Sequence, residues 1–485
     1  MEATNACLAS DDSLGIPKDV PDVRPQLIPF TGELAAVGEV VRLLSEAGGR
    51  PLLVGGCVRD ALLGIHAKDV DVEVYGLEPK AIESALRKIF AVIHVGAAFG
   101  VLKIKGHPID VSLPRRENQI GSGHRDFAIE GDPKMSPAEA ATRRDFTVNA
   151  LLWDPRSGEL IDPWGGVADL AAKRLRHVSD KFAEDPLRVL RAMQFAARFG
   201  FTVAPETIAL CATLTPNDIS PERVYEEWCK LLLRGVKPSA GLDFLHACGW
   251  SRFFPELHAV VGVAQDPEWH PEGDVWKHTA LCLDAFAAER LGDEKEDLIV
   301  GWAVLLHDLG KATCSKVESD GRIHAYGHEQ AGEPIARIFL ERMTQHREII
   351  DSVLPLVRWH AAPYELWKAQ AGDAGVRRLA AKVGRIDRLI RVDNADRKGR
   401  GTYFPANEIS PQGAWLSEKA HALAITANAP KRLALGRHLI ALGHSPQPWF
   451  STALDAAFEA QLDGVFTDEA GGIEWLKTWV KSQGK

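Results

Sequence analysis

The chain has 485 residues, of which 46% are hydrophobic and 25% are charged, with a formal net charge of −9. This length predicts about three domains, and the composition excludes a disordered or fibrous protein. No apolar run reaches the roughly 18 residues of a membrane span, the acidic start lacks the features of a signal peptide, and the seven cysteines are scattered. We therefore expect a cytoplasmic protein with reduced thiols and no membrane partner, in which local basic patches would bind any polyanion.

The first candidate site follows an extension and one helix. Residues 1–31 contain Pro and Asp without periodicity, and we expect a mobile extension there. Residues 32–47 have apolar residues on one helical face and end at two glycines. An apolar run at 51–54 then leads into Gly55 and Gly56, directly before a helical segment. Strand, glycine turn and helix start together predict a phosphate-binding turn, because unpaired helix N–H groups point outward there.

Two aspartates follow this turn, in a segment at 69–74 that alternates polar and apolar residues. On a strand, Asp69 and Asp71 point to the same face, where adjacent carboxylates repel each other unless a cation lies between them. A hard divalent ion such as Mg²⁺ is the natural partner, and it also binds nucleotide phosphates. Asp110, in the alternating segment 108–113, is a candidate third carboxylate on a neighbouring strand, with a solvent-facing aspartate as the alternative. Each motif alone also fits an ordinary strand–turn–helix unit with a solvated acidic edge.

The surrounding segments predict a mixed unit of strands and helices that gives way to helices. Residues 118–137 contain Gly, Asp and Pro with little periodicity, which predicts a loop. Few β signals occur after residue 166. The other expected elements are a helix at 79–90, strands at 91–95 and 101–105, and helices at 167–175 and 180–199.

An arginine pair beside an aspartate forms the second motif, in the run RRDFTVNAL that begins at Arg143. The planar fork of an arginine matches phosphate oxygens, so Arg144 is a candidate for contacting a triphosphate. For the three residues RRD alone, a structural Arg–Asp pair is the alternative.

The third motif, EDPLRVLRAMQ, begins at Glu184, and its proline suits the first turn of a helix. Asp185, Arg188 and Arg191 are spaced by three, which places them along one side of that helix. Cytosine and adenine each present an amino donor beside a ring-nitrogen acceptor. An Asp acceptor and an Arg donor would therefore select them over uracil and guanine without a template. An ordinary salt bridge on the helix surface is the alternative.

Together the segments GGCVRD and DVD, RRDFTVNAL and EDPLR resemble the motifs of the class II polymerase-β-like nucleotidyltransferases. This group comprises tRNA CCA-adding enzymes and bacterial poly(A) polymerases. The resemblance implies an α+β protein with a mixed-sheet head followed by an all-α neck and body. It also implies that tRNA, ATP and CTP are the partners, and that Mg²⁺ is the cofactor of the head.

The same resemblance implies a role for individual residues. Asp69, Asp71 and Asp110 are catalytic, and the first two hold Mg²⁺. Asp145 and Asn149 support the head. Many relatives have a third arginine where this chain has Gln194. That difference leaves open whether the product is complete CCA, CC or A alone, or a poly(A) tail. The implied nucleotide-binding residues are Gly55, Gly56, Arg59, Arg144, Asp185, Arg188 and Arg191.

A second set of candidate ligands lies in the C-terminal half and contains an adjacent His–Asp pair at the end of an apolar helix. Imidazole and carboxylate groups together suit one or two divalent ions that activate a water molecule. For any one of these histidines alone, a core residue with a satisfied side chain is the alternative. The set comprises His278, His307, Asp308, His328, His360 and Asp396.

The order of this second set resembles the HD phosphohydrolase superfamily. The resemblance implies a divalent metal at His278, His307, Asp308 and Asp396, with His328 and His360 completing a second site. Lys311 would meet a substrate phosphate. An HD domain joined to this kind of head implies phosphodiesterase or phosphatase activity on RNA ends, which would free the 3′-hydroxyl that polymerisation needs. A purely structural HD domain is the alternative.

Basic residues follow the HD pattern along a predicted helix at 376–391 and just after it. A solvated helix face is the default interpretation of such a run. Because the predicted head requires an RNA partner, we favour contacts to RNA phosphates, which weaken with salt. The residues are Arg378, Lys382, Arg385 and Arg388 on the helix, then Arg397, Lys398 and Arg400.

These observations predict five segments along the chain. An RNA-repair phosphohydrolase or RNA-binding protein with a vestigial head is the alternative from another class. The segments are a mobile extension at 1–31, a nucleotidyltransferase head at 32–166, a helical neck and body at 167–265 that binds RNA and nucleotide, an HD phosphohydrolase-like domain at 266–405, and a helical tail at 406–485.

Overall fold

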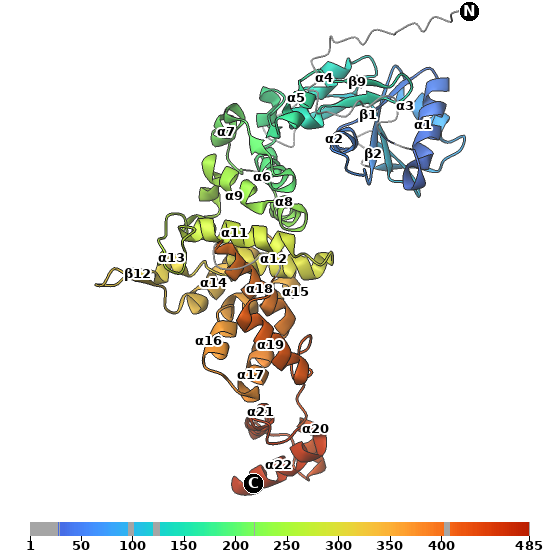
Figure 1. Cartoon of the computed structure of the whole chain (residues 1–485). Coiled ribbons are helices and arrows are strands. Elements are labelled where there is room, and N and C mark those ends of the chain that lie inside the picture. The colour runs from blue at the N-terminus through green and yellow to red at the C-terminus, as the bar shows by residue number, and fades with distance from the viewer. Residues whose placement is uncertain are drawn as a thin grey trace, which may run out of the picture. The chain divides into compact units, whose positions relative to one another are not determined.

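The structure is a computed structural model that describes residues 28, 30–95, 101–119, 127–217, 219–401 and 408–484 (Figure 1). The chain divides into two compact units. Unit 1 comprises Met1–Ile219 and Ala247–Trp250, and unit 2 comprises Ser220–His246 and Ser251–Lys485. The predicted extension at 1–31 lies almost entirely outside the described residues, so its mobility stays a prediction.

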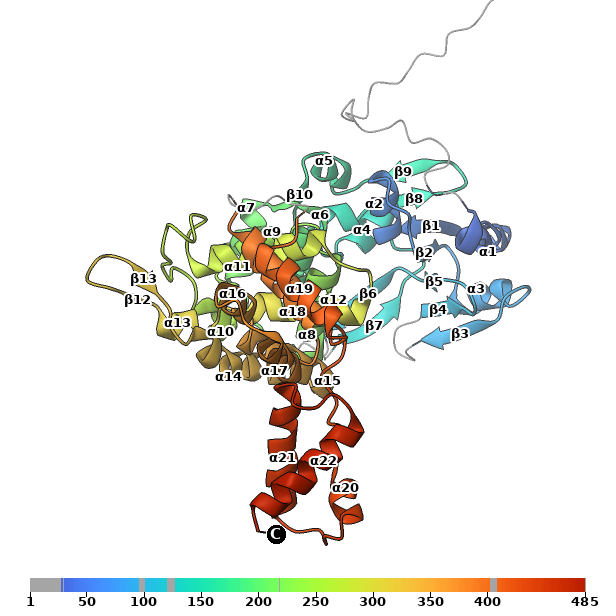
Figure 2. The same cartoon turned by 60° about the horizontal axis from the view of Figure 1, so that its bottom comes forward.

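Unit 1 is built on a seven-stranded sheet with the order β3-β4-β5-β2-β1-β8-β9 (Figure 2). The central strands β2 and β5 run parallel, and the other neighbours are antiparallel. This arrangement confirms the predicted mixed sheet of an α+β protein. The strands are β1 (Arg50–Val54), β2 (Val70–Tyr75), β3 (Val92–Val95), β4 (Val101–Ile104), β5 (Ile109–Ser112), β8 (Leu152–Asp154) and β9 (Glu159–Ile161).

Apolar periodicity explains how helices cover this sheet. Helix α1 (Ala35–Glu46) buries Val37, Val40 and Leu44, which recur at helical spacing, and it packs against β1 and α3 (Pro79–Leu86). A short 3₁₀ turn, η2 (Gly32–Leu34), precedes α1 where the prediction had one continuous helix.

The predicted loop at 118–137 is partly wrong. A two-stranded ribbon, β6 (Arg115–Gln119) paired with β7 (Phe127–Gly131), occupies much of it, and helix α4 (Pro137–Ala141) begins at its end. The run RRENQ of β6 has no apolar alternation, which is the signal that predicts strands. Residues 120–126 of the segment lie outside the described part of the chain.

The predicted helix at 180–199 is interrupted. Its first part is a 3₁₀ turn, η4 (Asp180–Glu184), and α6 (Leu187–Phe199) begins only after Pro186. A proline disfavours the helical conformation of the residue before it, and Asp185 is extended, with φ −128° and ψ 98°. The predicted alignment of Asp185 with Arg188 and Arg191 along one helix is therefore wrong, because Asp185 precedes the helix.

The second motif of unit 1 packs against α6. Phe146 of this motif contacts Phe182 of η4 and Phe195 of α6 edge-on, with ring centroids 5.6 and 5.8 Å apart. Further elements of unit 1 are α2 (Gly56–Leu62), η3 (Thr147–Asn149), α5 (Gly166–Ala171), β10 (Arg174–Leu175), β11 (Thr202–Val203) and α7 (Pro205–Ala212).

Unit 2 is helical apart from one short hairpin. The indole of Trp302 stacks on Tyr225, and Trp228 and Phe339 pack around it in the core. In chain order its elements are α8 (Pro221–Arg234), α9 (Pro238–Ala247), which ends in unit 1, η5 (Trp250–Phe253), which begins there, α10 (Pro255–His258), α11 (Val275–Ala288), α12 (Glu294–Leu306), α13 (Lys311–Cys314), β12 (Lys316–Val317), β13 (Ile323–His324), α14 (His328–Glu341), α15 (Arg347–Arg358), α16 (Ala362–Lys368), α17 (Asp373–Val383), α18 (Ile386–Gly399), α19 (Pro411–Ala422), α20 (Gly436–Ala441), α21 (Trp449–Leu462) and α22 (Glu469–Ser482).

The predicted helix at 376–391 is wrong as a single element, because Gly384 separates α17 from α18 with a φ of +75°. The expected helical tail is confirmed, and α20, α21 and α22 share a hydrophobic cluster around Phe450 and Leu476. Within the described part of the chain, no helix is both long and apolar enough to cross a membrane. The expected cytoplasmic location stays a prediction.

Candidate functional site

The glycine turn of unit 1 brings the first two sequence motifs together. Helix α2 begins two residues after β1 ends, and Gly55 between them has a φ of +75°. A Cβ atom on Gly55 would lie 2.6 Å from Nη1 of Arg144, so the missing side chain leaves room for that guanidinium. Arg144 also donates to the Asn149 carbonyl at 3.5 Å, and its Nη2 lies 3.9 Å from Glu73 Oε1.

The predicted carboxylates meet at one end of the parallel strand pair. Asp71 on β2 and Asp110 on β5 occupy paired positions, and Asp69 stands just before β2. Asp71 is exposed, yet the protein around it removes enough water to raise the pKa of its carboxyl, which Arg144 opposes and Asp69 and Asp110 reinforce. Lys103 Nζ lies 3.2 Å from Asp110. In the described chain, every compact group of three or more potential metal ligands lies in unit 2 and not here.

Arg59 lies in the interior of unit 1. Its side chain is buried, donates to Asp60 at 2.8 Å and to the side-chain oxygen of Asn149, and lies over the rings of Phe195 and Phe199. These contacts hold α2 against α6. The triphosphate contact implied for Arg59 stays a prediction, and the geometry instead supports a positioning role.

A buried polar network joins the second motif to α6. Asp145 accepts hydrogen bonds from its neighbour Phe146 N, from Asn149 Nδ2 and from Arg191 Nε, each at 2.8 Å. Burial alone would raise the pKa of Asp145, but the charge of Arg191 and these hydrogen bonds hold that pKa below its usual value. Asp145 and Asn149 thus link Arg59 to Arg191, as expected of residues that support the head.

The candidate base-reading residues already have contacts within unit 1. Arg188 donates to the carbonyl oxygens of Lys181 and Arg143 at 2.6 and 2.8 Å, and Asp185 Oδ1 accepts from Leu187 N at 3.1 Å. Burial lowers the pKa of Arg143 to about 10, and the nearby cation of Arg188 contributes to the same shift. Two arginines this close favour an anion beside them.

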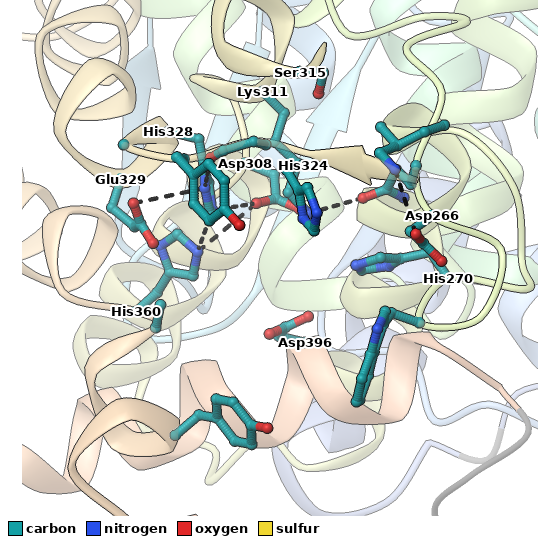
Figure 3. Close-up of a pocket in the computed structure, with 18 of the residues that line it drawn as sticks. Asp266, His270, Asp308, Lys311, Ser315, His324, His328, Glu329, His360 and Asp396 are labelled. Carbon is teal, nitrogen blue, oxygen red and sulfur yellow. Dashed lines mark hydrogen bonds and ion pairs between the residues drawn. The ribbon is translucent and has the colours of Figure 1, made fainter. Parts of the chain in front are cut away.

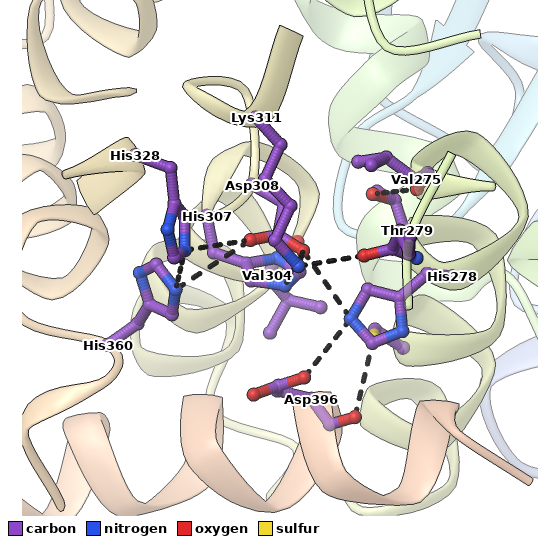
Figure 4. A network of polar contacts seen from close by, with 12 residues as sticks. Val275, His278, Thr279, Val304, His307, Asp308, Lys311, His328, His360 and Asp396 are labelled. Atoms are coloured by element: carbon purple, nitrogen blue, oxygen red, sulfur yellow. Dashed lines mark hydrogen bonds and ion pairs between the residues drawn. The ribbon is translucent and has the colours of Figure 1, made fainter. Parts of the chain in front are cut away.

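In unit 2, elements far apart in the sequence bring all six predicted HD-type ligands together (Figure 4). They stand at defined places in the helices. His278 is in α11, His307 and Asp308 directly follow α12, His328 begins α14, His360 follows α15, and Asp396 is in α18.

Asp308 is the centre of this set. Its Oδ2 lies 3.2 Å from His307 Nε2 and 3.6 Å from His278 Nε2, and its Oδ1 lies 3.3 and 3.7 Å from Nε2 of His328 and His360. Asp396 Oδ1 lies 3.1 Å from His278 Nε2. The two oxygens of Asp308 therefore face two separate pairs of histidines, His307 and His278 on one side and His328 and His360 on the other.

The donor atoms fit a divalent metal. His307 Nε2 and both oxygens of Asp308 are buried. His307 Nε2 lies 3.2 Å from Asp308 Oδ2, which also lies 2.7 Å from Lys311 Nζ, and Asp308 Oδ1 lies 3.3 Å from His328 Nε2. Imidazole nitrogen with carboxylate oxygen is a common ligand set for divalent transition metals. Residues of this set form groups whose ligand atoms lie within 4.8 Å of one another, with Cys282 Sγ as a further candidate donor beside His278 and His307.

Glu272 is a functional residue that the sequence analysis did not assign. Its Oε1 pairs with Nδ1 of His278 at 2.6 Å and with Nδ1 of His270 at 2.8 Å. Burial would raise the pKa of Glu272, but these hydrogen bonds bring it to about 2. A carboxylate behind a ligating imidazole fixes the ring and leaves Nε2 free for a metal. Glu272 lies in the run HPEGD at 270–274. Its role could not be read from the sequence, because it depends on this loop folding back so that Glu272 meets His278.

A cavity of about 650 Å³ is lined by four of the six candidate ligands, Asp308, His328, His360 and Asp396 (Figure 3). Lys311, the candidate phosphate contact, lines it with Nζ 2.7 Å from Asp308 Oδ2 and 2.8 Å from Gln265 Oε1. Arg397 and Arg400 line the same cavity. These two arginines, predicted as part of a basic run toward RNA, therefore belong to the HD-type site.

The other predicted RNA-binding cations have internal contacts in unit 2, and their RNA contacts stay a prediction. Arg378 pairs with Glu459 and Asp463, Lys382 Nζ lies 4.1 Å from the ring centroid of Trp359, Arg385 pairs with Asp387 and Glu296, and Arg388 pairs with Glu296.

Comparison with known proteins gives three family matches along the chain. The model described as "Poly A polymerase head domain" matches residues 52–176, "Probable RNA and SrmB- binding site of polymerase A" matches 200–261, and "HD domain" matches 276–397. The first range contains the glycine turn, the aspartates and the RRDFTVNAL run, and the third contains all six predicted HD-type ligands, whereas the segment of Asp185, Arg188 and Arg191 lies between the first two ranges.

Relatives match over most of the chain. The multifunctional CCA protein of Xanthomonas campestris pv. campestris (strain B100) is 37% identical over 392 residues, 78% of this chain and 91% of that protein. A Bacillus stearothermophilus CCA-adding enzyme solved with CTP covers 94% of this chain and 99% of its own, with a TM-score of 0.64 and 23% identity. A Thermotoga maritima CCA-adding enzyme complexed with tRNA gives a TM-score of 0.57 and 20% identity, and covers 95% and 98%. These structural likenesses concern the fold, whereas the sequence identity shows that the chain belongs to the family of the multifunctional CCA proteins.

Proposed function

We propose that this protein is a template-independent tRNA nucleotidyltransferase that adds C, C and A from CTP and ATP to tRNA 3′ ends and releases pyrophosphate. The observation that carries the proposal is the meeting of Arg144, the glycine turn and the paired aspartates of β2 and β5 in unit 1. The names of the relatives support the same activity, and the tRNA complex of a structural neighbour supports the same partner.

In this proposal the carboxylates bind the metal ion and Arg144 contacts the triphosphate. Asp69 and Asp71 would hold Mg²⁺, and Asp110 would join them from the parallel strand. The ion, when bound, would neutralise the α-phosphate and align it with the 3′-oxygen of the tRNA. Arg144, beside Gly55 and Gly56, would balance the charge of the triphosphate. As the 3′-oxygen forms its bond to the α-phosphorus, the bond to pyrophosphate breaks, and the proton of the 3′-hydroxyl passes to solvent water.

Base selection falls to the segment before and at the start of α6. Asp185 would accept from the amino group of cytosine or adenine, and Arg188 would donate to the ring nitrogen. Arg188 retains N–H donors beyond the two that bind carbonyl oxygens. The RNA contacts proposed for Arg378, Lys382, Arg385 and Arg388 have the least support, because each side chain already has a partner in unit 2.

The HD-type site supports a second activity, a metal-dependent phosphodiesterase or phosphatase acting on RNA ends. When bound, a divalent ion at Asp308 would supply an activated water. Lys311 would hold the phosphate, and Glu272 would keep His278 in its orientation. Water adds to phosphorus, a bond from phosphorus to a ribose oxygen breaks, and that oxygen takes up a proton. The product carries the free hydroxyl that nucleotide addition needs.

One incorporation experiment distinguishes complete CCA addition from two alternative activities of the same head. A poly(A) polymerase is favoured by the family description of the head, and an enzyme that adds only CC or A fits the same motifs. Purified protein would be incubated with tRNA lacking its 3′ end and with one labelled nucleotide at a time. We expect two additions from CTP alone and a single A only after both. Long A tails, or no CTP incorporation, would refute the assignment.

An RNA-repair hydrolase or RNA-binding protein with a vestigial head is the alternative from another class. The same assay decides it, because a vestigial head incorporates neither nucleotide. Supplying the tRNA with and without a 3′-phosphate tests the second activity in parallel. We expect nucleotide addition to both tRNA substrates. On the substrate with a 3′-phosphate, removal of the phosphate should precede addition.

A further inference from the structure

A second cavity, of about 430 Å³, adjoins the HD-type site and has no role in the functions proposed above. It shares four lining residues with the larger cavity: Trp269, Tyr364, Arg397 and Arg400. The two cavities therefore have a common wall, and a molecule held at Asp308 could extend from one into the other.

The chemistry of the two cavities differs. The larger one is lined by Asp308, Lys311, His328, His360 and Asp396. The smaller one is lined by three aromatic residues, Trp269, Tyr364 and Trp367, with Pro411 beside them. Gln412 and Glu268 add hydrogen-bonding groups. An aromatic compartment with a few polar groups beside a phosphate-handling site matches the two halves of a nucleotide.

Two residues of the shared wall, Trp269 and Arg397, have groups that a ligand can contact. Trp269 is 53% exposed, an unusual state for a large aromatic side chain. The guanidinium of Arg397 lies 4.7 Å from the ring centroid of Tyr364, and its buried Nε has no hydrogen-bond partner in the described chain. A stacked ring with an adjacent cation is a typical surface for binding a base next to its phosphate.

We propose that Trp269, Tyr364 and Trp367 form a base-binding compartment, so that the HD-type site acts on the terminal nucleotide of an RNA and not on phosphate esters in general. The inference rests on the hydrolytic function proposed for that site. The base stacks in the smaller cavity, Arg397 lies between base and phosphate, and the scissile phosphate reaches Lys311 and Asp308. Because stacking tolerates every base, the compartment accepts all four nucleotides.

Two substrates of the full-length protein test this, each supplied with the divalent ion that gives activity. One is adenosine 2′,3′-cyclic phosphate, and the other is ribose 2′,3′-cyclic phosphate, which has the same reacting group without a base. We expect the base to lower KM about tenfold or more, with kcat changed little, because stacking acts on binding and not on the bond that breaks. Replacing adenine by uracil should change KM only a few fold.

Variants of the shared wall test whether its aromatic residues cause the lower KM of the substrate with a base. Trp269→Ala and Tyr364→Ala should each raise KM for the adenosine substrate about five- to tenfold. The matched variants Trp269→Phe and Tyr364→Phe retain a ring and should stay within about twofold of the wild type. Nucleotide addition to tRNA by the same preparations reports whether the chain is folded.

The outcomes separate the inference from the function on which it rests. Equal KM values for the two substrates in the wild type, or equal losses for both in the alanine variants, would overturn the base compartment and leave the hydrolytic activity standing. Hydrolysis of neither substrate with any divalent ion would overturn the hydrolytic activity and the compartment with it.

Discussion

The two candidate sites hold their carboxylates in opposite ways. In unit 1, Asp69 and Asp71 are exposed at the end of a sheet, and they belong to no compact ligand group among the described residues. In unit 2, His278, His307 and Asp308 are each at most 2% exposed, and Nε2 of His307 and of His278 lies 3.2 and 3.6 Å from Asp308 Oδ2. One site is open and incomplete, and the other is enclosed and fully assembled from side chains.

Under the proposed function, this difference predicts how each site would acquire its ion. Mg²⁺ usually keeps several waters and binds through one or two carboxylates together with substrate phosphates. The open site of unit 1 suits an ion that arrives with its nucleotide. Buried imidazoles with carboxylates behind them suit an ion that stays with the protein between turnovers. The comparison predicts that the two activities respond independently to changes in the two ligand sets.

The largest expected effect is at the open site. Asp71→Ala should lower nucleotide addition to tRNA by at least about 10³-fold, because the carboxylate positions the ion that stabilises charge in the transition state. Hydrolysis of a cyclic phosphate by the same preparation should stay within twofold. The matched control is Glu78→Ala, an exposed acid elsewhere in unit 1. Unchanged addition by the Asp71 variant would remove unit 1 from the catalytic assignment.

The enclosed site should give the converse result. His307→Ala should reduce cyclic-phosphate hydrolysis to roughly 1% or less, since it removes the buried imidazole beside Asp308 that is a proposed metal ligand. Tightly bound divalent metal, measured by elemental analysis after gel filtration, should fall with it, whereas Asp71→Ala should leave the metal content unchanged. His421→Ala, an exposed histidine in α19, is the control. A parallel loss of nucleotide addition would contradict independent metal sites.

The sequence predicted the residues of the site in unit 2 more completely than those of the site in unit 1. All six predicted HD-type ligands meet in unit 2, and the sequence singled them out because each is of a distinctive residue type and their order in the chain is characteristic. That Asp308 faces two ligand groups could not be predicted, since its two oxygens are assigned only by how α12, α14 and α15 meet. In unit 1 the motifs were located from the sequence. Arg59 was predicted to contact the nucleotide phosphates, but its side chain is buried against α6. Its helix α2 follows a phosphate-type turn, and the sequence does not show which face of so short a helix meets α6.

A smaller effect should come from the carboxylate behind His278. Glu272→Gln keeps the size of the side chain but replaces a charged acceptor for two imidazoles with a neutral amide. Contacts of this kind are typically worth about 10- to 100-fold in metal affinity. We therefore expect metal to be retained at high concentration and lost on dilution, with hydrolysis restored by added ion. The control is Glu418→Gln on the exposed surface of α19. Wild-type retention of metal on dilution would show that the enclosed site does not depend on this contact.

The smallest effect concerns how the open site is held in place. Arg191→Met should destabilise unit 1 by about 2 kcal/mol at pH 7, because it leaves the Asp145 carboxylate, 7% exposed, without its cation. This value lies below the range for fully buried pairs, since the Arg191 side chain is 34% exposed. Hydrogen exchange of the amides of α6 measures the change, and Arg156→Met, an exposed arginine of unit 1, is the control.

The stability difference between the wild type and Arg191→Met should depend on pH. The folded pKa of Asp145 is lowered, so the wild type gains stability from it above the unfolded value of about 3.9 and loses that stability as the pH falls through the folded value. In Arg191→Met, burial without the cation raises the pKa of Asp145, and protonation then relieves the unpaired charge at higher pH than in the wild type. The stability gap between the two proteins should therefore narrow as the pH falls from 7 toward 4.5. A gap that stays constant over this range would mean that Arg191 holds α6 by packing alone, and the open site would then owe its position to apolar contacts such as those of Phe146 with Phe195.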